Sequence, residues 1–427
     1  MFSYLMLRRG LWLFAVLLAG VSAPALAGPS LTLEAAQQLA LKESRKLAAG
    51  EASIAAAREM AAAAGQLPDP VLKVGVDNLP VSGPDRFNLS NDFMTMRRIG
   101  VMQELPGAAK RQLRAGRFER AADKAAAEKA LAAAAIERDT ALAWFALYFA
   151  GATARAIDEQ AGQAGLELKA AEGGFKGGRG GLADVLAVRG ALAMLGERAS
   201  EAARRVQSAR IGLARWVGPA GEASELAGLP DLDHVSIDAA SIGSRLAHHP
   251  QVAVFAREEG VARAEVALAR ANRQADWSVE VAFQQRGAAY SNMLSVGLSI
   301  PLQWDRARRQ DRELAARIAQ AEVAGAERDD ALRAHVAETT AMLGDWQNGR
   351  ERLARYRGEL IPLAQERAAA ALAAWRGGKS SLPEVLAARR GETDVRLQAI
   401  GLEADTARLW AQLNFMAAAS HPDKEAP

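Results

Sequence analysis

The chain has 427 residues, of which 50% are hydrophobic but only 5% aromatic, so alanine and leucine supply most of its apolar content. Its formal net charge of +3 provides no basic field of the kind that binds nucleic acid, and no nucleic-acid partner is expected. It contains no cysteine, which excludes disulfides, cysteine-based zinc or redox sites and a lipid anchor on an N-terminal cysteine. Alanine-rich sequence with many charged residues predicts long helices that pack at close range.

The first 27 residues have the pattern of a secretory signal peptide. Arg8 and Arg9 form the positive segment, "LWLFAVLLAG" forms the apolar segment, and Ala25-Leu26-Ala27 is an A-x-A cleavage site. We therefore expect residues 1–27 to be removed and the mature protein to function beyond the inner membrane. The alternative is an uncleaved membrane anchor, although the apolar run is short and ends in small residues.

Two passages repeat each other about 200 residues apart. "FKGGRGGLADVLAVR" occupies residues 175–189 and "WRGGKSSLPEVLAAR" occupies residues 375–389, with seven of fifteen positions identical. Looser echoes precede both passages at nearly the same offset, which predicts a duplication of the whole chain. The predicted parts are a first repeat (28–217), a linker (218–234), a second repeat (235–416) and a C-terminal tail (417–427).

Each repeat is predicted to contain a helix, a β-hairpin, a very long helix, a glycine-rich turn and a returning helix. The expected positions in the first repeat are a helix at 33–66, a hairpin at about 71–105, a long helix at 108–175 and a turn at 177–181. The prolines of "LPDP" at 67–70 end the first helix, since proline disfavours helix both at and before itself.

The second repeat has the same expected order. Its helix is predicted at 237–272, its hairpin at about 277–302, its long helix at 305–375 and its turn at 377–381. Pro362 is expected to interrupt the long helix as a kink. At 1.5 Å per residue, helices of nearly seventy residues reach about 100 Å.

Apolar and polar residues alternate through the predicted strands. In "WSVEVAFQQ", for example, Trp277, Val279, Val281 and Phe283 alternate with small or polar residues. Such alternation fits either a half-buried soluble hairpin or a transmembrane strand. The signal peptide, together with helices far too long to cover two short hairpins, favours the transmembrane strand. Four strands cannot close a barrel and lipid excludes open edges, so we expect three copies to form a twelve-stranded barrel around water.

These features together resemble the TolC-type outer-membrane factors, in particular their heavy-metal (CzcC/CusC-like) branch. The resemblance covers essentially the whole mature chain and rests on the duplication, "LPDP", the strand-to-helix junction "QELPGAAKR" and the two "GG[RK]xxLx[DE]VL" turns. It implies a mainly α fold with a transmembrane β-barrel: a homotrimer whose twelve-stranded barrel stands on a twelve-helix periplasmic tunnel. It also implies a periplasmic adaptor (membrane fusion) protein, an inner-membrane proton-driven transporter and outer-membrane lipid as partners.

By this resemblance, the two glycine-rich turns are the periplasmic tips of the helical hairpins and contact the adaptor. The expected contact residues are Gly177, Gly178, Arg179, Gly180, Gly181 and Leu182 in one tip, and Gly377, Gly378, Lys379, Ser380, Ser381 and Leu382 in the other. A helix-terminating turn explains the glycines equally well. We expect Leu182, Val185 and Leu186, like their counterparts in the second repeat, to pack each hairpin.

Four further residues are candidates for the periplasmic gate. Asp184 and Glu384 match an acidic position that lines the closed tunnel mouth in the family, where converging carboxylates would favour cations. The alternative is that both are helix N-terminal charges that complement the helix dipole, and the two roles are compatible. Phe175 and Trp375 fit an aromatic constriction in relatives, with core packing as the alternative.

Met94 and Met96 are weak candidates for a soft-metal site, because thioethers bind Cu(I) and Ag(I). Methionine also fills gaps in ordinary packing, and the neighbouring Arg97 and Arg98 oppose a cation site. No other metal site and no cofactor are expected.

The sequence offers no catalytic constellation. His248 and His249 are expected at a solvated helix start, and the other histidines, including His335, are isolated. There is no HExxH, GxSxG or phosphate-loop motif, so we expect no enzymatic activity.

The expected function is a passive exit duct in the outer membrane, extending into the periplasm, for a tripartite efflux pump with heavy-metal cations as cargo. The alternatives are a duct for drugs, other organic compounds or secreted molecules, and a periplasmic coiled-coil structural protein.

Overall fold

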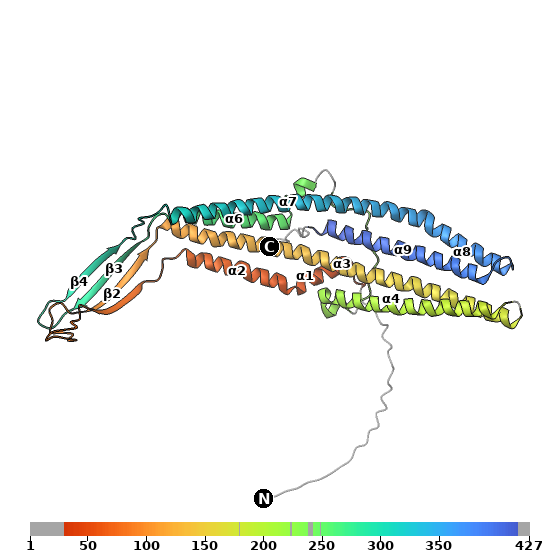
Figure 1. Ribbon diagram of the computed structural model, residues 1–427, viewed down its shortest axis with the longest axis horizontal. Helices are drawn as coiled ribbons and strands as arrows, with labels where there is room; N and C mark the ends of the chain where they lie inside the picture. The colour runs from red at the N-terminus through yellow and green to blue at the C-terminus, as the bar shows by residue number, and fades with distance from the viewer. Residues whose placement is uncertain (1–29, 179, 223, 238–241, 248, 417–427) are drawn as a thin grey trace, which may run out of the picture.

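The computed structural model describes residues 30–178, 180–222, 224–237, 242–247 and 249–416. The predicted signal peptide and C-terminal tail lie outside these ranges. Within them the chain is mainly helical and elongated: the helices run side by side along one axis, and a β-sheet extends from one end of the bundle (Figure 1).

Both halves of the chain contain their elements in the same order. The first half comprises α1 (Leu33–Glu43), α2 (Arg45–Ala64), β1 (Val71–Asp77), β2 (Met96–Leu105), α3 (Ala108–Lys176) and α4 (Leu182–Glu222). The second half comprises α5 (Ile242–Leu246), α6 (Pro250–Ala271), β3 (Trp277–Gln285), β4 (Met293–Ser299), α7 (Gln310–Arg355), the π-helix η1 (Tyr356–Leu360), α8 (Ile361–Arg376) and α9 (Leu382–Asn414). The backbone of α4 leaves the helical conformation at Gly218 (φ 66°, ψ −173°), where the predicted linker begins.

The opening helix of the first half is divided in two, which corrects the prediction of one continuous helix at 33–66. Ser44 has an extended backbone, and its hydroxyl accepts a hydrogen bond from the Leu47 amide at 3.3 Å. Thr32 caps α1 in the same way, accepting from the Ala35 amide at 3.1 Å. A capping hydroxyl satisfies an amide that the helix itself leaves free, so a second helix starts at Ser44.

The opening helix of the second half also departs from prediction, because α6 starts at Pro250 rather than continuing from residue 237. Proline suits the first helical position, where no amide donor is needed. His249 precedes it and accepts a hydrogen bond from the Gln251 amide at 3.2 Å through Nδ1.

The expected helix start at His249 is therefore correct, but its expected solvation is wrong. The side chain is buried, and its ring lies 4.6 Å from that of His335 on α7, so His335 is not isolated. His248 lies outside the described residues.

The second long helix begins at Gln310, five residues later than predicted, and the predicted interruption at Pro362 is confirmed. The turn just before the proline is the π-helix η1. Proline lacks an amide donor and its ring crowds the preceding turn, and a wider turn relieves this crowding. The first long helix, α3, has no such break over its 69 residues and is about 100 Å long.

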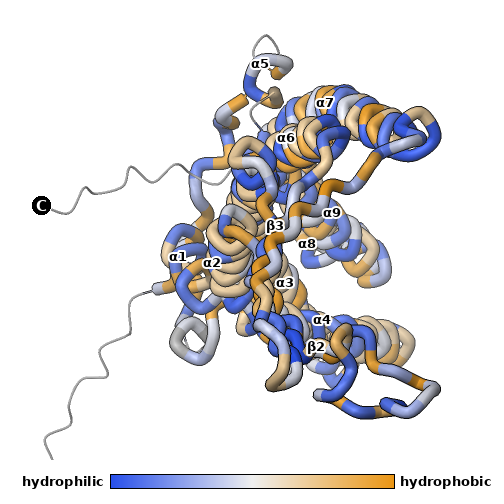
Figure 2. The backbone as a smooth tube through the Cα atoms, turned by 90° about the vertical axis from the view of Figure 1, so that its left-hand side faces the viewer, coloured by the Kyte–Doolittle hydropathy of each residue, from blue (hydrophilic) through white to orange (hydrophobic). Residues whose placement is uncertain are grey.

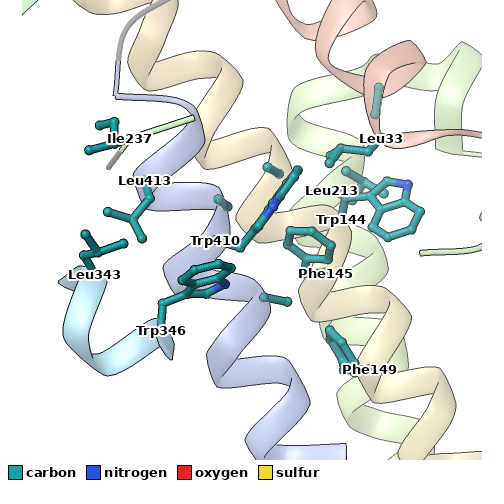
Figure 3. Packing of buried hydrophobic residues seen from close by; sticks show 14 of the residues in the cluster. Leu33, Trp144, Phe145, Phe149, Leu213, Ile237, Leu343, Trp346, Trp410 and Leu413 are labelled. Atoms are coloured by element: carbon teal, nitrogen blue, oxygen red, sulfur yellow. The ribbon is translucent and has the colours of Figure 1, made fainter. Parts of the chain in front are cut away.

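The largest core lies near the middle of the bundle, where α1, α3, α4, α7 and α9 meet (Figure 3). Trp410 of α9 packs edge-on against Phe145 of α3, with ring centroids 6.0 Å apart. The indole of Trp144 donates to the Leu31 carbonyl at 3.0 Å, and that of Trp410 donates to the His234 carbonyl at 2.7 Å. Residues from both halves of the chain therefore share one core.

Small residues let the long helices approach closely. Eight of the buried residues of α3 are alanines. On α7, a Cβ at Gly349 would lie 2.5 Å from the Thr406 hydroxyl of α9.

Among the described helices, α3 alone has a stretch long and apolar enough to cross a membrane by composition. Since α3 also carries Trp144 and Phe145 into the core, we attribute that stretch to packing in the bundle.

Candidate functional site

The four strands form one antiparallel sheet in the order β1-β2-β3-β4. The hairpins of the two halves meet through β2 and β3, where Val101 pairs with Val281 and Ile99 pairs with Phe283. The two hairpins therefore make a single surface, with β1 and β4 as its open edges.

One side of this sheet is apolar across all four strands. Two cross-strand rows illustrate it: Leu72–Val101–Val281–Val296 and Val74–Ile99–Phe283–Leu294. Directly paired residues point to the same side of a sheet, so the alternation expected from the sequence is confirmed. Seen from the sheet end, hydrophobic and hydrophilic residues alternate along β2 and β3 (Figure 2).

We call this surface the apolar face. Its exposed members are Leu72, Val74, Val76, Ile99, Val101, Leu105, Trp277, Val281, Phe283, Leu294, Val296, Leu298 and Ile300. Val74 and Val296 are 74% and 71% exposed. A continuous apolar patch of this extent marks a contact with lipid or with other protein.

The opposite side of the sheet carries charged and small residues. Lys73 on β1 pairs with Glu280 on β3 at 2.6 Å. Arg98 on β2 also pairs with Glu280, and lies 3.8 Å from Asp77. The network links three strands and both halves of the chain.

Gly100 is needed on that side for a close approach. A Cβ added to it would lie 2.7 Å from the Cβ of Ala282, which is itself fully buried.

The strand-to-helix junction is fixed by a buried lysine that sequence reasoning did not single out. Lys110, at the start of α3, donates to the Gln274 carbonyl at 2.8 Å and pairs with Asp276 at 2.7 Å. Arg114, one turn later, lies 3.4 Å from the same carboxylate. The signal was present in the "QELPGAAKR" motif, whose lysine is Lys110. These contacts anchor the sheet to the bundle across the two halves of the chain.

The two helical tips have the same backbone geometry. Gly178 and Gly378 follow the ends of α3 and α8 with φ of 69° and 70°, a left-handed conformation that suits glycine. The preceding amides of Gly177 and Gly377 each donate to a carbonyl four residues back at 3.0 Å. Both tips are thus helix-terminating turns, which agrees with the structural interpretation of their glycines and leaves the adaptor contact a prediction. Arg179 lies outside the described residues.

The tip carboxylates stand in the first turns of α4 and α9. The Gly181 amide donates to the Asp184 carboxylate at 3.1 Å, and the Ser381 hydroxyl donates to Glu384 at 3.1 Å. Each carboxylate therefore supports the start of its helix. Lys379, in the turn that precedes α9, is exposed.

A small core joins the two hairpins just above the tips. Val185 and Val188 of α4 pack there with Leu382 and Val385 of α9. Trp375 packs against this core, as core packing predicted, whereas Phe175 is 47% exposed.

The expectation that Leu182 and Leu186 pack the hairpin is wrong, since they are 54% and 55% exposed. At about 100° per residue, Leu186 lies about 160° around the helix from Val188, and Leu182 lies at the margin of the packed side, in the first turn of α4. The first tip therefore presents two leucines to solvent, while the corresponding Leu382 of the second tip is buried.

Further up, polar contacts bridge the hairpins around a cavity of about 300 Å³ between α3, α4 and α9. Glu167 is buried there, with its carboxylate 3.5 Å from Arg389, and Gln160 donates to the Arg389 carbonyl at 3.2 Å. Burial raises the pKa of Glu167, and Arg389 partly offsets this effect. Arg389 ends the repeated "VLAAR" passage, which gave no sign of its partner on α3.

The two methionine candidates lie at the loop end of the first hairpin. Met94 is 48% exposed, and Met96 pairs with Asp77 at the end of β1. Within the part of the chain that the structure describes, no three His, Cys, Asp or Glu side chains group as metal ligands.

No protein-family profile matches the chain, and a search of curated proteins gives no match. Solved structures do match. The outer-membrane channel OprN gives a TM-score of 0.74 at 17% identity, covering 90% of this chain and 89% of OprN. The outer membrane protein VceC from Vibrio cholerae gives 0.73 at 18% identity, covering 90% and 95%. CusC, whose structures concern transmembrane channel formation, gives 0.73 at 15% identity, covering 90% and 91%. Across nine-tenths of its length, the chain therefore has the fold of these outer-membrane proteins.

Proposed function

We propose that this protein is the outer-membrane channel of a tripartite efflux pump, a passive exit duct that reaches from the outer membrane into the periplasm. The observation that carries the proposal is the apolar face, which crosses all four strands and is backed by a charged face. A transmembrane barrel needs strands with one side toward lipid and the other toward water. The shared fold with outer-membrane channels supports the same conclusion.

The proposed assembly is a homotrimer with a twelve-stranded barrel. In lipid, every backbone group at an open edge must find a partner. The two edge strands, β1 and β4, both have seven residues, so β4 of one copy and β1 of the next are matched in length. Three four-stranded sheets joined in this way close a ring.

Aromatic residues lie at both ends of the apolar face, as at the two interfaces of a membrane barrel. At the helix end, Trp277 and Trp304 are 53% and 88% exposed. At the loop end, Phe87, Phe93 and Tyr290 are exposed. Rings that are apolar but carry a polar edge or sit beside polar groups suit the boundary between acyl chains and headgroups.

The helical tips are proposed to meet the periplasmic adaptor, which links the channel to a proton-driven inner-membrane transporter. The exposed Leu182 and Leu186 offer an apolar contact beside small tip residues, and they support an interface better than the glycines alone. Asp184 and Glu384 would contribute six carboxylates to the tunnel mouth of a trimer, with Phe175 and Trp375 nearby.

Heavy-metal cations are the proposed cargo, because converging carboxylates favour cations. The test is growth of a strain lacking the gene on copper, silver, zinc, cadmium, cobalt and a drug panel. Sensitivity to the metals supports this cargo, and sensitivity to copper and silver alone would also favour Met94 and Met96. Sensitivity to drugs alone would keep the duct and overturn the cargo.

The membrane assignment is tested by two neighbouring arginine substitutions on β4. Val296→Arg places a charge on the apolar face, where it costs about 2–4 kcal/mol near the middle of a bilayer. Ser295→Arg places the same charge at the same depth on the opposite side. We expect Val296→Arg to lose most outer-membrane trimer and Ser295→Arg to retain it. Equal trimer yields from the two variants would overturn the assignment of the apolar face to lipid.

A further inference from the structure

The loop end of the sheet, remote from the helices, carries guanidinium groups without carboxylate partners. Arg86 lies in the β1–β2 loop, Arg97 lies near the start of β2, and Arg286 follows β3. Across the described residues, none of these three forms an ion pair. Arg98, by contrast, is neutralised by Glu280 and Asp77 on the charged side of the sheet.

Arg97 stands at the limit of the apolar face. Its register partners are Val76 and Gln285, so it lies on the same side as Ile99, two residues further along β2. Arg97 is exposed. The apolar face therefore ends, on the loop side, in an uncompensated positive charge.

The two loops hold this end of the sheet in a fixed arrangement. Arg97 Nη2 donates to the Arg286 carbonyl at 3.3 Å, and Arg286 Nε donates to the Phe93 carbonyl at 2.9 Å. The Arg286 guanidinium also lies 4.9 Å from the ring centre of Tyr290. At Gly287, a Cβ would overlap the Ser90 carbonyl oxygen, so the loops are in close contact.

We propose that this end of the sheet binds the phosphate groups of lipid headgroups in the leaflet on the loop side. The proposal rests on the proposed function, which places the apolar face in lipid. A guanidinium just beyond an apolar surface lies where acyl chains give way to headgroups, and its planar donors match phosphate oxygens. Arg86 and Arg97 supply the charge, while exposed Phe87 and Phe93 contact the adjoining apolar region.

The helix end of the sheet also carries exposed guanidinium groups: Arg306 and Arg309, which follow Trp304, form no ion pair among the described residues. Lys110 is neutralised there by Asp276, and the exposed Trp277 and Trp304 lie at the helix-side boundary of the apolar face. The loop end also contains Asp85 and Asp92, and the Asp92 carboxylate accepts a hydrogen bond from the Met94 amide at 2.8 Å. The loop end differs in that Arg286 ties its two loops together, so its arginines lie in a fixed arrangement, and we expect them to contribute to the binding of anionic lipid in the leaflet on the loop side.

The test uses the mature full-length oligomer and two double variants. Arg86→Gln with Arg97→Gln removes the proposed contacts, and Arg204→Gln with Arg210→Gln removes two exposed charges from α4. Binding of phosphatidic acid and of phosphatidylcholine to the detergent-solubilised oligomer is measured by native mass spectrometry. We expect the wild type to prefer phosphatidic acid, the loop variant to bind it about thirtyfold more weakly, and the α4 variant to match the wild type.

Insertion into vesicles of phosphatidylcholine alone separates this proposal from the function on which it rests. If the wild type does not insert, the membrane assignment is wrong. If it inserts but the loop variant binds phosphatidic acid as the wild type does, only the headgroup proposal is overturned. Competition by inorganic phosphate at the concentration of the lipid would likewise overturn it, in favour of a soluble anion.

Arg97→Gln also removes the hydrogen bond from Arg97 to the Arg286 carbonyl, so a third variant tests the role of charge while both arginines stay in place. Asp85→Asn removes a negative charge next to Arg86 without changing any arginine. We expect it to bind phosphatidic acid more tightly than the wild type does, and unchanged or weaker binding would contradict the proposal.

Discussion

His249 has to remain uncharged in the folded protein. Its side chain is 7% exposed and accepts the first hydrogen bond of α6 through Nδ1, which a protonated ring cannot do. Burial lowers its pKa to about 4, with help from the neighbouring His335 and despite a hydrogen bond to the Met416 backbone. Folding therefore selects the neutral ring.

We expect this residue to make the fold acid-sensitive. Because the ordinary pKa of histidine is 6.5, the unfolded chain binds more protons than the folded chain between pH 4 and 6.5. The contribution of His249 to stability is full above pH 6.5 and is lost as the pH falls, by about 3 kcal/mol in total. Thermal unfolding of the wild type and of His249→Asn, which keeps a capping side chain, measures this effect.

The asparagine variant should lose most of the pH dependence across that window. Glu167 provides an internal contrast, because its raised pKa makes stability fall as the pH rises above its ordinary value of 4.5. Equal slopes in the two proteins between pH 4 and 6.5 would show that His249 is not the group responsible.

At the residue scale, the sequence predicted that His249 stands at a helix start, but it did not predict that the His249 side chain is buried. The following proline marks a helix start locally. Its partner His335 lies on α7, 86 positions later, and no local pattern connects the two. Lys110 and Glu167 were missed for the same reason, since their partners come from distant segments.

At the scale of the elements, the two tips repeat one turn but bury different leucines. Leu382 is 2% exposed in the core between the hairpins. We expect Leu382→Ala to lower the free energy of unfolding by about 2–4 kcal/mol, because it leaves a cavity. Chemical denaturation of the purified protein would measure this loss, and a change below about 1 kcal/mol would contradict the packing described.

Leu182 and Leu186 should behave in the opposite way. Since both are half exposed, replacing both with serine should leave the midpoint of unfolding nearly unchanged. If they meet the adaptor, the double variant should lose resistance in a growth assay and lose crosslinking to the adaptor. Full resistance at a normal protein level would remove them from the proposed interface, and Ile211→Ser, on an exposed part of α4 away from the tip, serves as the control.

Periodicity predicted elements well where a single repeat governs the whole element. The alternation of apolar and polar residues in β3 and β4 correctly predicted which residues form the apolar face of the sheet, because successive side chains in a strand point to opposite faces. Glycine pairs at 177–178 and 377–378 gave the correct turns, since the left-handed conformation favours glycine. The break at Ser44 was missed because its capping hydrogen bond competes with good helix formers on both sides.

At the scale of the whole molecule, the four-stranded sheet of one chain is incomplete for the proposed membrane role. The sequence predicted this from the strand count, and the fold matches channels over 90% of the chain. The proposed trimer would depend on contacts between copies, which neither the sequence pattern nor one chain contains. The proposed gate depends on assembly in the same way, since the proposal brings Asp184 and Glu384 together only between copies.

A trimer with converging carboxylates should conduct cations better than anions. In planar bilayers, Asp184→Asn with Glu384→Gln should lower the cation preference, seen as a smaller reversal potential in a salt gradient. Glu197→Gln with Glu366→Gln, two exposed carboxylates elsewhere on the helices, is the charge-matched control. A reversal potential unchanged by the tip variant would exclude these carboxylates from the conduction path.

The pairing of β2 with β3 also dictates an order of assembly. Val101 pairs across the sheet with Val281, a residue 180 positions later, so the first hairpin waits for its partner strand until α3, α4 and α6 have been made. Contacts of such long sequence separation form slowly, and exposed apolar strands aggregate in the meantime. Each new chain must therefore spend a period in which β2 lacks its partner β3, and for the proposed outer-membrane channel a holding chaperone in the periplasm is the natural protection during that time.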